Sequence, residues 1–189
     1  MARTKDRDKP AQIIDAAFSV FGQTGYDATL MKDIAVRAGI SSGTIYTYFA
    51  DKKDLFQATV RVGWDGFIAR VRDIVDSPEP VEKRFERFLE AGFASLKRYL
   101  PLLRGMLFES SQMNLMQGRI EEFCGLVERL AAVRGRRPTR AAADPEHRRS
   151  LIRVTVVGVL FSAALADPSR VDAEIDRLKR TISLMLSGG

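Results

Sequence analysis

The segment that most constrains the fold spans residues 26–56 and predicts two short helices joined by a tight glycine turn. Ala35 lies within the first helix, where a small side chain lets a second helix cross closely. Gly39 follows at the turn, because glycine adopts the positive φ that ends a helix without a Cβ clash. Ile45 and Phe49 recur on one side of the second helix, so we expect a few apolar anchors to bury it.

The surface between those anchors is polar and aromatic. Its hydroxyl groups suit contacts with phosphates and base edges, and a helix buried in a core would not need them. The pattern is therefore typical of a helix-turn-helix, whose second helix enters the major groove of DNA. The side chains concerned are those of Ser41, Ser42, Thr44, Tyr46, Thr47 and Tyr48.

Composition indicates a soluble globular protein. Of the 189 residues, 46% are apolar, which is enough for a sizeable core. No stretch approaches the roughly 18 consecutive apolar residues that a membrane span requires. The first residues, MARTKDRDK, lack the apolar stretch of a secretory signal. We therefore expect a cytoplasmic protein that does not enter a membrane.

Cysteine and histidine are scarce. Cys124 is the single cysteine and His147 the single histidine, so neither a disulfide framework nor a metal site is expected. No cofactor is expected either. The usual catalytic sets of nucleophile, base and orienting group are nearly excluded for the same reason, so we do not expect an enzyme.

The formal charge of +6 does not by itself indicate nucleic acid, because of where the charge lies. Residues 1–55 carry eight Lys/Arg and seven Asp/Glu, whereas residues 129–153 carry eight arginines and two acidic residues. The excess therefore lies around the arginine-rich loop at 134–149. That loop is interpreted as a solvated segment, with an acidic partner, a second DNA segment or a lipid headgroup as alternatives.

Almost every periodic stretch predicts helix, so the chain is expected to be all-α with about nine helices. Thr29, Ser41 and Asp51 are the expected N-caps of the second, third and fourth helices. The pairs Asp144-Pro145 and Asp167-Pro168 mark the starts of the last two. Five of the expected helices cover about 10–23, 52–75, 81–99, 102–108 and 113–133, with Pro101 ending one and restarting the chain. The other four are expected to begin near Thr29, Ser41, Asp144 and Asp167.

The helices divide into two expected domains. Residues 1–50 form a three-helix N-terminal domain, residues 51–189 form a helical C-terminal domain, and the helix at 52–75 connects them. Apolar residues lie on nearly all sides of the helix at 145–165, and a narrow apolar seam follows the last helix, which predicts a dimer interface. The predicted interface residues are Val156, Leu160, Val171, Ile175, Leu178, Ile182 and Met185.

A small-molecule pocket is expected among the helices between about 60 and 133. Methionine and phenylalanine suit an adaptable apolar site, although a helical core uses the same residues. Glu109 could fix a polar group or simply face water, and Trp64 could line the pocket or pack between domains. The candidate residues are Trp64, Phe88, Phe93, Met106, Phe108, Glu109, Met113, Met116 and Phe123.

The first third of the chain resembles the tetracycline-repressor (TetR) family of bacterial transcription regulators. Tyr48 and Thr47 depart from the usual pattern, in which histidine and an aromatic residue respectively are frequent. Beyond about residue 60 only the size and the helical layout resemble the family, so no ligand carries over. The matching residues are Phe21, Gly25, Tyr26, Thr29, Ile34, Ala35, Ala38, Gly39, Ser41, Gly43, Ile45, Tyr46, Tyr48, Phe49, Lys52, Leu55 and Phe56.

The resemblance implies a homodimer that holds two helix-turn-helix units on a palindromic operator. A small, mainly apolar effector in the C-terminal domain would release the DNA of such a repressor. The alternative is a DNA-binding dimer without an effector, controlled by a protein partner or by abundance. A purely structural helical adaptor is a third possibility.

The residues expected to contact DNA belong to the helix-turn-helix motif or lie at helix N-termini, which attract phosphate. For Ser41 the alternative is a capping role, and for Tyr46 and Tyr48 it is packing in the small core. For Lys52 it is a solvated side chain. The predicted set is Thr29, Lys32, Ser41, Ser42, Gly43, Thr44, Tyr46, Thr47, Tyr48 and Lys52.

Overall fold

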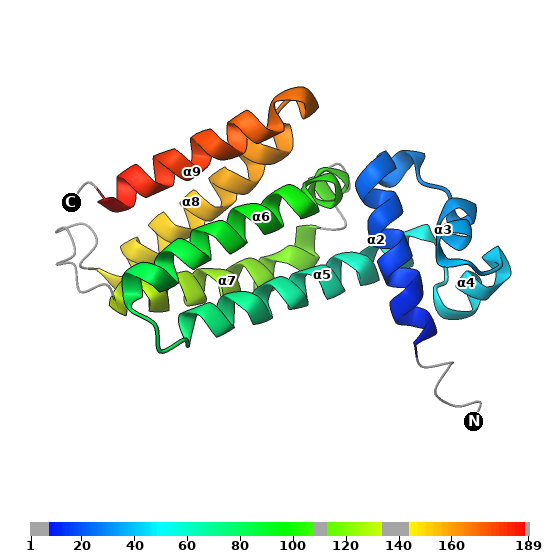
Figure 1. Ribbon diagram of the computed structural model, residues 1–189, viewed down its shortest axis with the longest axis horizontal. Coiled ribbons are helices and arrows are strands. Elements are labelled where there is room, and N and C mark those ends of the chain that lie inside the picture. Colours follow the sequence, from blue (N-terminus) through cyan, green and yellow to red (C-terminus); the bar gives the residue numbers. More distant parts are fainter. Residues whose placement is uncertain (1–7, 108–112, 134–143, 188–189) are drawn as a thin grey trace. The chain divides into compact units, whose positions relative to one another are not determined.

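The computed structural model describes the backbone of residues 8–107, 113–133 and 144–187, and their side chains except at 105–107, 113–117, 133, 168 and 182–187. This described part is all-α, as predicted, with eight α-helices and one short 3-10 helix (Figure 1). The elements are α2 (Lys9–Ala28), α3 (Met31–Ala38), α4 (Ser42–Tyr48), α5 (Lys52–Val75), α6 (Val81–Leu107), α7 (Met113–Val133), α8 (Pro145–Leu165), η3 (Pro168–Arg170) and α9 (Val171–Ser187).

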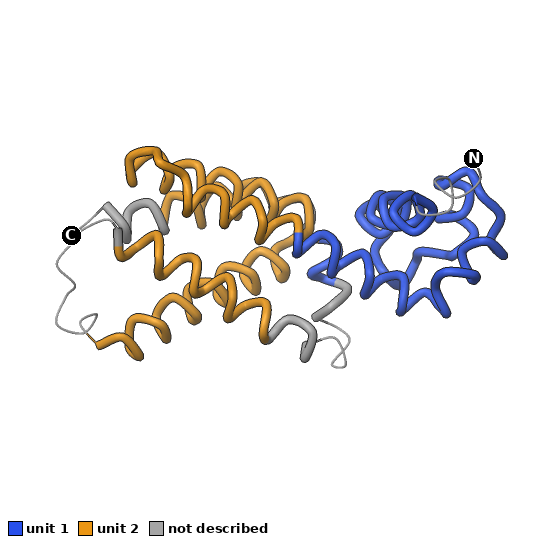
Figure 2. The backbone as a smooth tube through the Cα atoms, turned by 90° about the horizontal axis from the view of Figure 1, so that it is seen from below, with its two compact units in different colours: residues 1–65, 101–112 blue, residues 66–100, 113–189 orange. Residues whose placement is uncertain are grey.

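The chain divides into two compact units, coloured separately in Figure 2. The first unit, called the head below, contains residues 1–65 and 101–112. The second unit, called the body, contains residues 66–100 and 113–189. The expected boundary at residue 50 therefore lies inside the head, which also includes the first part of α5 and the last part of α6.

A capping aspartate sets the start of the connector helix α5. Asp51 lies immediately before it, and its Oδ1 accepts a hydrogen bond from the backbone N–H of Asp54 at 2.8 Å. The Asp54 carboxylate in turn accepts from the backbone N–H of Ala50 at 3.0 Å. These bonds satisfy N–H groups that have no partner within the helix. The predicted cap and the predicted range of 52–75 are both confirmed.

Pro101 does not end a helix, and the separate helix expected at 102–108 is wrong. Instead α6 continues from Val81 to Leu107 with Pro101 inside it. A proline in a helix interior removes one hydrogen bond and costs about 3 kcal/mol. Its neighbours Leu100 and Leu102 are both 3% exposed. Burying two leucines contributes roughly 3–6 kcal/mol, which is enough to offset that cost. Pro101 is also the residue at which α6 passes from the body to the head.

The head is organised around side chains that α2, α3, α4 and α5 bury together. Ile13, Ile34 and Ile45, one from each of the first three helices, are fully buried. Phe21 of α2 and Phe56 of α5 meet edge to face, with ring centroids 5.1 Å apart. One apolar anchor from each helix therefore reaches a common core, as the spacing of apolar residues predicts.

The body has a core built from α5, α6 and α7, with charged pairs on its surface. Val71, Leu96 and Leu130 are buried in it. Arg72 of α5 pairs with Glu122 of α7 at 2.7 Å, with both side chains about half exposed. Exposed pairs of this kind contribute little, typically below about 1 kcal/mol. The apolar core therefore accounts for most of the stability of the body.

The two Asp-Pro pairs mark helix starts, as predicted. The Asp144 side chain accepts from the N–H of Glu146 at 3.1 Å, and that of Asp167 accepts from the N–H of Ser169 at 2.8 Å. A hydrogen bond with His147, followed by the bond from the Glu146 N–H, holds the pKa of Asp144 below its ordinary value. The second start is the short helix η3, which leads directly into α9.

Candidate nucleic-acid interface

The turn before α4 is set by Gly39 and Ser41. Gly39 has a φ of 65°, the left-handed conformation expected of it. Its N–H and that of Ile40 donate to the carbonyls of Val36 and Ala35, each at 3.1 Å, and so close the end of α3. Ser41 then caps α4 by accepting from the N–H of Thr44 at 3.2 Å. Both local predictions are confirmed.

The outward face of α4 carries the hydroxyls that the sequence predicts there. Ile45 is fully buried, whereas Tyr46 keeps 54% of its surface exposed. Thr47 is exposed and donates its hydroxyl to the carbonyl of Gly43 at 3.2 Å. An exposed ring beside small polar groups is suited to contacts with base edges in the major groove. Ser41 and Gly43 are also exposed, and Ser42, Thr44 and Tyr48 are half-buried.

Lys32 lies at the start of α3, the first helix of the motif, and its side chain is exposed. The ammonium group of Lys32 and the N–H groups at the N-terminus of α3 together favour an anion. Contact with a phosphate therefore remains a prediction for Lys32, as contact with DNA does for the exposed residues of α4.

Thr29 does not match its predicted roles. The cap residue of α3 is Leu30, without a side-chain cap, and Thr29 has 0% of its surface exposed. Its hydroxyl donates to the carbonyl of Gly25 at 2.6 Å and lies 2.7 Å from the hydroxyl of Thr24. A fully buried hydroxyl is not available to a phosphate, so both the capping and the DNA-contact predictions are wrong for this side chain.

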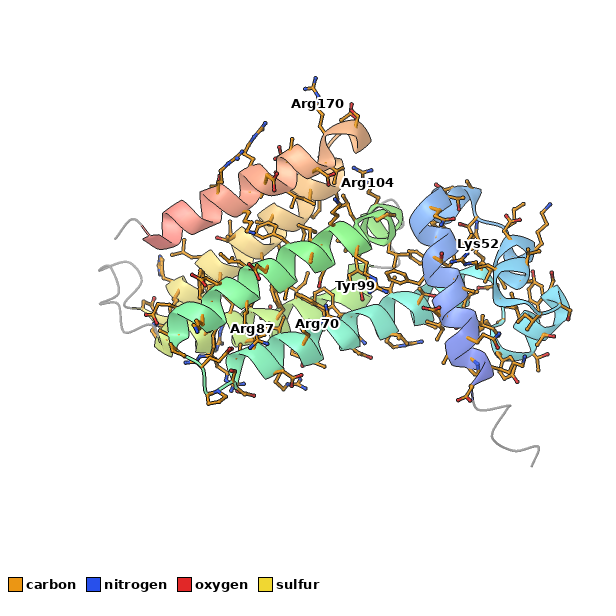
Figure 3. All side chains as sticks on the ribbon, in the orientation of Figure 1. Lys52, Arg70, Arg87, Tyr99, Arg104 and Arg170 are labelled. Atoms are coloured by element: carbon orange, nitrogen blue, oxygen red, sulfur yellow. The ribbon has the colours of Figure 1, made fainter. Side chains whose placement is uncertain are left out.

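Lys52 also turns inward rather than toward solvent. Its Nζ donates to the carbonyls of Tyr26, Asp27 and Thr29 at 2.9, 3.2 and 3.2 Å. The same atom lies 4.6 Å from the centroid of the Tyr26 ring. A lysine ammonium has three N–H donors, and all three are used. Figure 3 shows Lys52 among the helices of the head, so the predicted phosphate contact is not supported.

The side chains of Thr29 and Lys52 together hold residues 25–29, called the elbow below. Gly25 has φ 78° and ψ 171° there, a conformation essentially limited to glycine, so it breaks α2 close to residue 23, where the first helix was expected to end. The break leaves backbone carbonyls without helical partners, and buried carbonyls of that kind need donors. Thr29 and Lys52 supply these donors to four carbonyls of the elbow.

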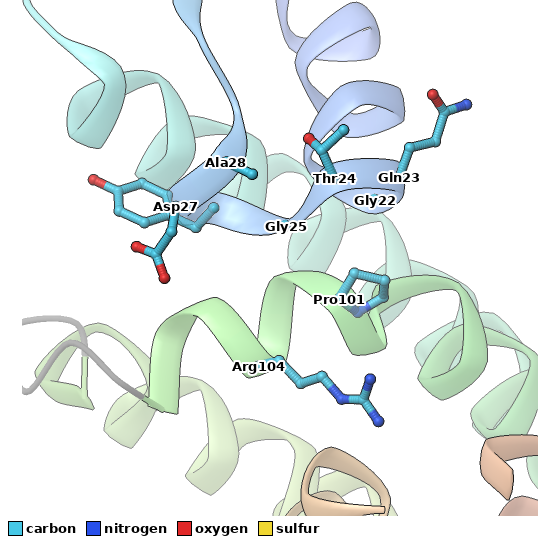
Figure 4. Close-up of a pocket in the computed structure, with 9 residues that line it drawn as sticks. Gly22, Gln23, Thr24, Gly25, Asp27, Ala28, Pro101 and Arg104 are labelled. Carbon is cyan, nitrogen blue, oxygen red and sulfur yellow. The ribbon is translucent and has the colours of Figure 1, made fainter. Parts of the chain in front are cut away.

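A groove of about 410 Å³ lies beside the elbow, within the head (Figure 4). Residues 22–28 line it together with Pro101 and Arg104 of α6. In Figure 4 the guanidinium of Arg104 and the amide of Gln23 point away from the elbow backbone. A ligand site normally has a few polar groups that converge. The groove has no such set, and no predicted effector residue lines it.

The predicted effector residues fall into both units. Phe88 and Phe93 are buried in the body. The Phe88 ring stacks on that of Phe123 at 5.9 Å, and Phe67 lies 5.3 Å from Phe123. These rings form a packed aromatic cluster, and Trp64 belongs to the head. The side chains of Met106, Phe108, Glu109, Met113 and Met116 lie outside the described residues.

Among the predicted dimer residues whose side chains are described, one is buried within the body and four are half-buried. Ile175 is 7% exposed, so the chain itself already covers it and the prediction is wrong for this residue. Val156, Leu160, Val171 and Leu178 are half-buried, and the side chains of Ile182 and Met185 lie outside the described residues. The large apolar side chains that α8 exposes are Leu151, Val154, Phe161 and Leu165.

Two of the three arginines of α8, Arg149 and Arg153, have carboxylate partners. Arg149 pairs with Glu128 of α7 at 3.3 Å, and Arg153 pairs with Glu121 of the same helix. This pairing weakens the proposals of an acidic partner or a lipid headgroup for that part of the cluster. Residues 134–143 of the loop lie outside the described part.

Chemistry other than binding has little support in the described part of the chain. Burial raises the pKa of the Cys124 thiol, which disfavours the reactive thiolate. No group of three or more His, Cys, Asp or Glu residues lies close enough to hold a metal ion among the residues described. Within the same residues, no helix is both long and apolar enough to cross a membrane.

Two neighbouring short helices with a glycine turn, a capped second helix and an exposed hydroxyl face define the head as a helix-turn-helix. Residues 13–59 match the family described as bacterial regulatory proteins, tetR family.

Curated relatives match the chain over about half of their length. The HTH-type transcriptional repressor KstR2 of Mycobacterium tuberculosis is 34% identical over 88 residues, which cover 47% of this chain and 44% of that protein. The fatty acid metabolism regulator protein of Bacillus subtilis is 31% identical over 90 residues, which cover 48% of this chain and 46% of that protein.

Solved structures share the whole fold. A transcriptional regulator from Cytophaga hutchinsonii aligns with a TM-score of 0.72 at 19% identity, covering 96% of this chain and 98% of that one. A TetR/AcrR family regulator from Thermobifida fusca aligns with a TM-score of 0.68 at 24% identity, again covering 96% of this chain and 98% of that one. Residues 13–59 form a helix-turn-helix of the tetR family of bacterial regulatory proteins, and the described part of the chain has the fold of solved TetR-type regulators. These are regulators rather than enzymes, in agreement with the sequence-based expectation.

Lys32 and Lys52 provide a matched pair that tests the inward orientation of Lys52. Lys32→Ala should reduce the slope of log affinity against log salt concentration by about 1, because one phosphate contact is lost. Lys52→Ala should leave that slope unchanged and lower the free energy of unfolding by about 1–3 kcal/mol, because elbow carbonyls lose their donor. Fluorescence anisotropy with duplex DNA from 50 to 200 mM salt and urea unfolding measure the two effects. An equal loss of slope in both variants would contradict the inward orientation.

Proposed function

We propose that the chain is a sequence-specific DNA-binding transcriptional regulator that inserts α4 into the major groove. The observation that carries this proposal is the asymmetry of α4. Ile45 is fully buried on one side, and Gly43, Tyr46 and Thr47 are exposed on the other. In a helix-turn-helix, the residues near the start of the second helix contact base edges.

Contacts of two kinds are proposed for the motif. Lys32 and Ser41 would bind phosphates, which positions the head on the duplex without reading sequence. Tyr46 and Thr44 would lie against base edges, where a ring packs on a thymine methyl group and a hydroxyl bonds a donor or acceptor. Sequence preference would therefore depend on α4, and overall affinity on the start of α3.

We further propose that two copies of the chain bind together. One recognition helix touches only a few base pairs, and two-fold pairing places two of them about 34–36 Å apart on a palindromic site. The exposed apolar residues of α8 support such a pair. Leu151, Val154, Phe161 and Leu165 follow spacings of three, seven and four, which is the repeat of a helix-bundle seam.

The same helix α8 is apolar on its inner side, where Ala163 and Ala164 are buried. A helix with apolar residues on two opposite sides needs a cover on each. In the body α7 and α9 pack on α8, and the face with Val154 and Phe161 is exposed at 70% and 40%. A second copy of this chain is the proposed cover.

Repression controlled by a small, mainly apolar effector is the proposed mode of regulation. The aromatic cluster of Phe67, Phe88 and Phe123 gives the body an apolar interior suited to such a compound. One relative is named a repressor and another a fatty acid metabolism regulator protein. An activator, FasR of Mycolicibacterium smegmatis, is also among the relatives, which keeps activation as the alternative outcome.

A DNA-binding dimer without an effector is the second candidate, with a protein partner or abundance as its control. A thermal shift of the protein against a library of apolar compounds separates the two, because a ligand of the folded state stabilises it by mass action. For either candidate, we propose the cytoplasm as the site of action, since both need access to DNA.

The α4 face is tested by Tyr46→Ala and Thr44→Ala. Each should weaken binding to a duplex selected from a random pool by about 1–3 kcal/mol and relax the preference at one position of the site. Val62→Ala is a matched control, because Val62 is 52% exposed on α5. Selection and sequencing with each variant measures the preference. Unchanged preference and affinity in both α4 variants would reject this face.

The pairing surface is tested by Val154→Glu. We expect it to weaken self-association more than about 100-fold, because each copy loses a buried valine worth roughly 1.5 kcal/mol and must desolvate a carboxylate. Ala131→Glu is the control, since Ala131 is exposed on α7. Sedimentation velocity measures the assembly. A normal dimer of the Val154 variant, or a wild-type monomer at high concentration, would count against this surface.

A further inference from the structure

The recognition helix α4 has few contacts of its own to fix its orientation. It contains seven residues, of which Ile45 is buried. The next apolar anchor, Phe49 at 7% exposure, follows the helix. A short helix with one fully buried side chain relies on the segments at its ends for its orientation, so the angle of α4 depends on the turn to which it is attached.

One side chain from another helix reaches that turn. The amide Nε2 of Gln12, in the second turn of α2, donates to the backbone carbonyl of Ala38 at 2.8 Å. Ala38 is the last residue of α3, and the last four carbonyls of a helix have no partner within it. The carbonyls of Ala35 and Val36 are already bonded by the turn itself, so Gln12 adds a donor that the local motif does not supply.

We propose that Gln12 is a positioning residue for sequence recognition. It connects α2 to Ala38, four residues before α4 begins at Ser42, and thereby limits the tilt of α4 relative to the head core. It would raise the preference for the specific site without itself contacting a base. The inference rests on the proposed function of α4.

The side-chain chemistry at position 12 makes this contact specific. A glutamine amide donates a hydrogen bond, whereas a glutamate of the same shape is ionised at neutral pH and only accepts. Gln12→Glu would therefore oppose a carboxylate to the Ala38 carbonyl, and Gln12→Ala would leave that carbonyl without the donor. Gln23 lies on the same helix with an exposed side chain, so Gln23→Ala is the matched control.

The test compares two duplexes, one selected by the wild-type protein from a random pool and one with the same bases scrambled. Gln12→Ala and Gln12→Glu should bind the selected duplex about five- to tenfold more weakly, the equivalent of one hydrogen bond. For the uncharged variant Gln12→Ala, binding to the scrambled duplex and the salt slope should not change. Gln23→Ala should behave as wild type, and all measurements are made well below the unfolding midpoint of each variant.

Amide hydrogen exchange in the free protein tests the same contact without DNA. The N–H groups of Gly39 and Thr44 should exchange faster in Gln12→Ala than in wild type or Gln23→Ala. Unchanged exchange, or an unchanged ratio of the two affinities, would overturn the positioning role. An equal loss on both duplexes with a smaller salt slope would overturn it too, because Gln12 would then be a phosphate contact.

Failure of the proposed function has a different signature. A wild-type protein that selects no sequence would reject sequence recognition itself, whatever the exchange data show for Gln12. A wild-type preference that Gln12→Ala retains in full would reject the positioning role alone.

Discussion

The seven-residue helix α4 depends on contacts outside itself, because isolated helices shorter than about 12–15 residues are marginal in water. Its shape is fixed by the Ser41 cap, by the left-handed Gly39 and by the buried Ile45. The elbow then fixes α3, since Lys52 and Thr29 bind the carbonyls that the Gly25 break leaves open. The outward face of α4 is therefore a product of contacts that lie behind it.

Local features were predictable from the sequence, because their causes lie within a few residues. The left-handed Gly39, the Ser41 cap and the Asp51 start of α5 each require only neighbouring backbone groups. Lys52 and Gln12 were different. Each bonds a carbonyl 23 to 26 residues away, and sequence spacing contains no signal for such a pair. The pattern around Lys52 predicted a phosphate, and the folded head supplies its own carbonyls instead.

Packing between distant residues of the chain was likewise not predictable from sequence spacing. Burial of Leu100 and Leu102 keeps α6 continuous through Pro101, although proline by itself predicts a stop. The sequence places apolar residues on nearly all sides of α8, but it does not indicate which side the folded chain leaves exposed. Ile175 of the predicted seam is covered by the chain itself, whereas Val154 and Phe161 of α8 are exposed. The packing of α8 against α9 in the folded chain is needed to tell the covered face from the exposed one.

The central claim is that α4 meets DNA through its exposed face while the side chains behind it hold its angle. An NMR titration of isotope-labelled protein with a duplex selected from a random pool tests it most directly. We predict that the largest amide shift changes fall on Gly43–Tyr48 and on the start of α3, around Lys32. Changes confined to the body, with the amides of α4 unperturbed at saturating duplex, would contradict the account.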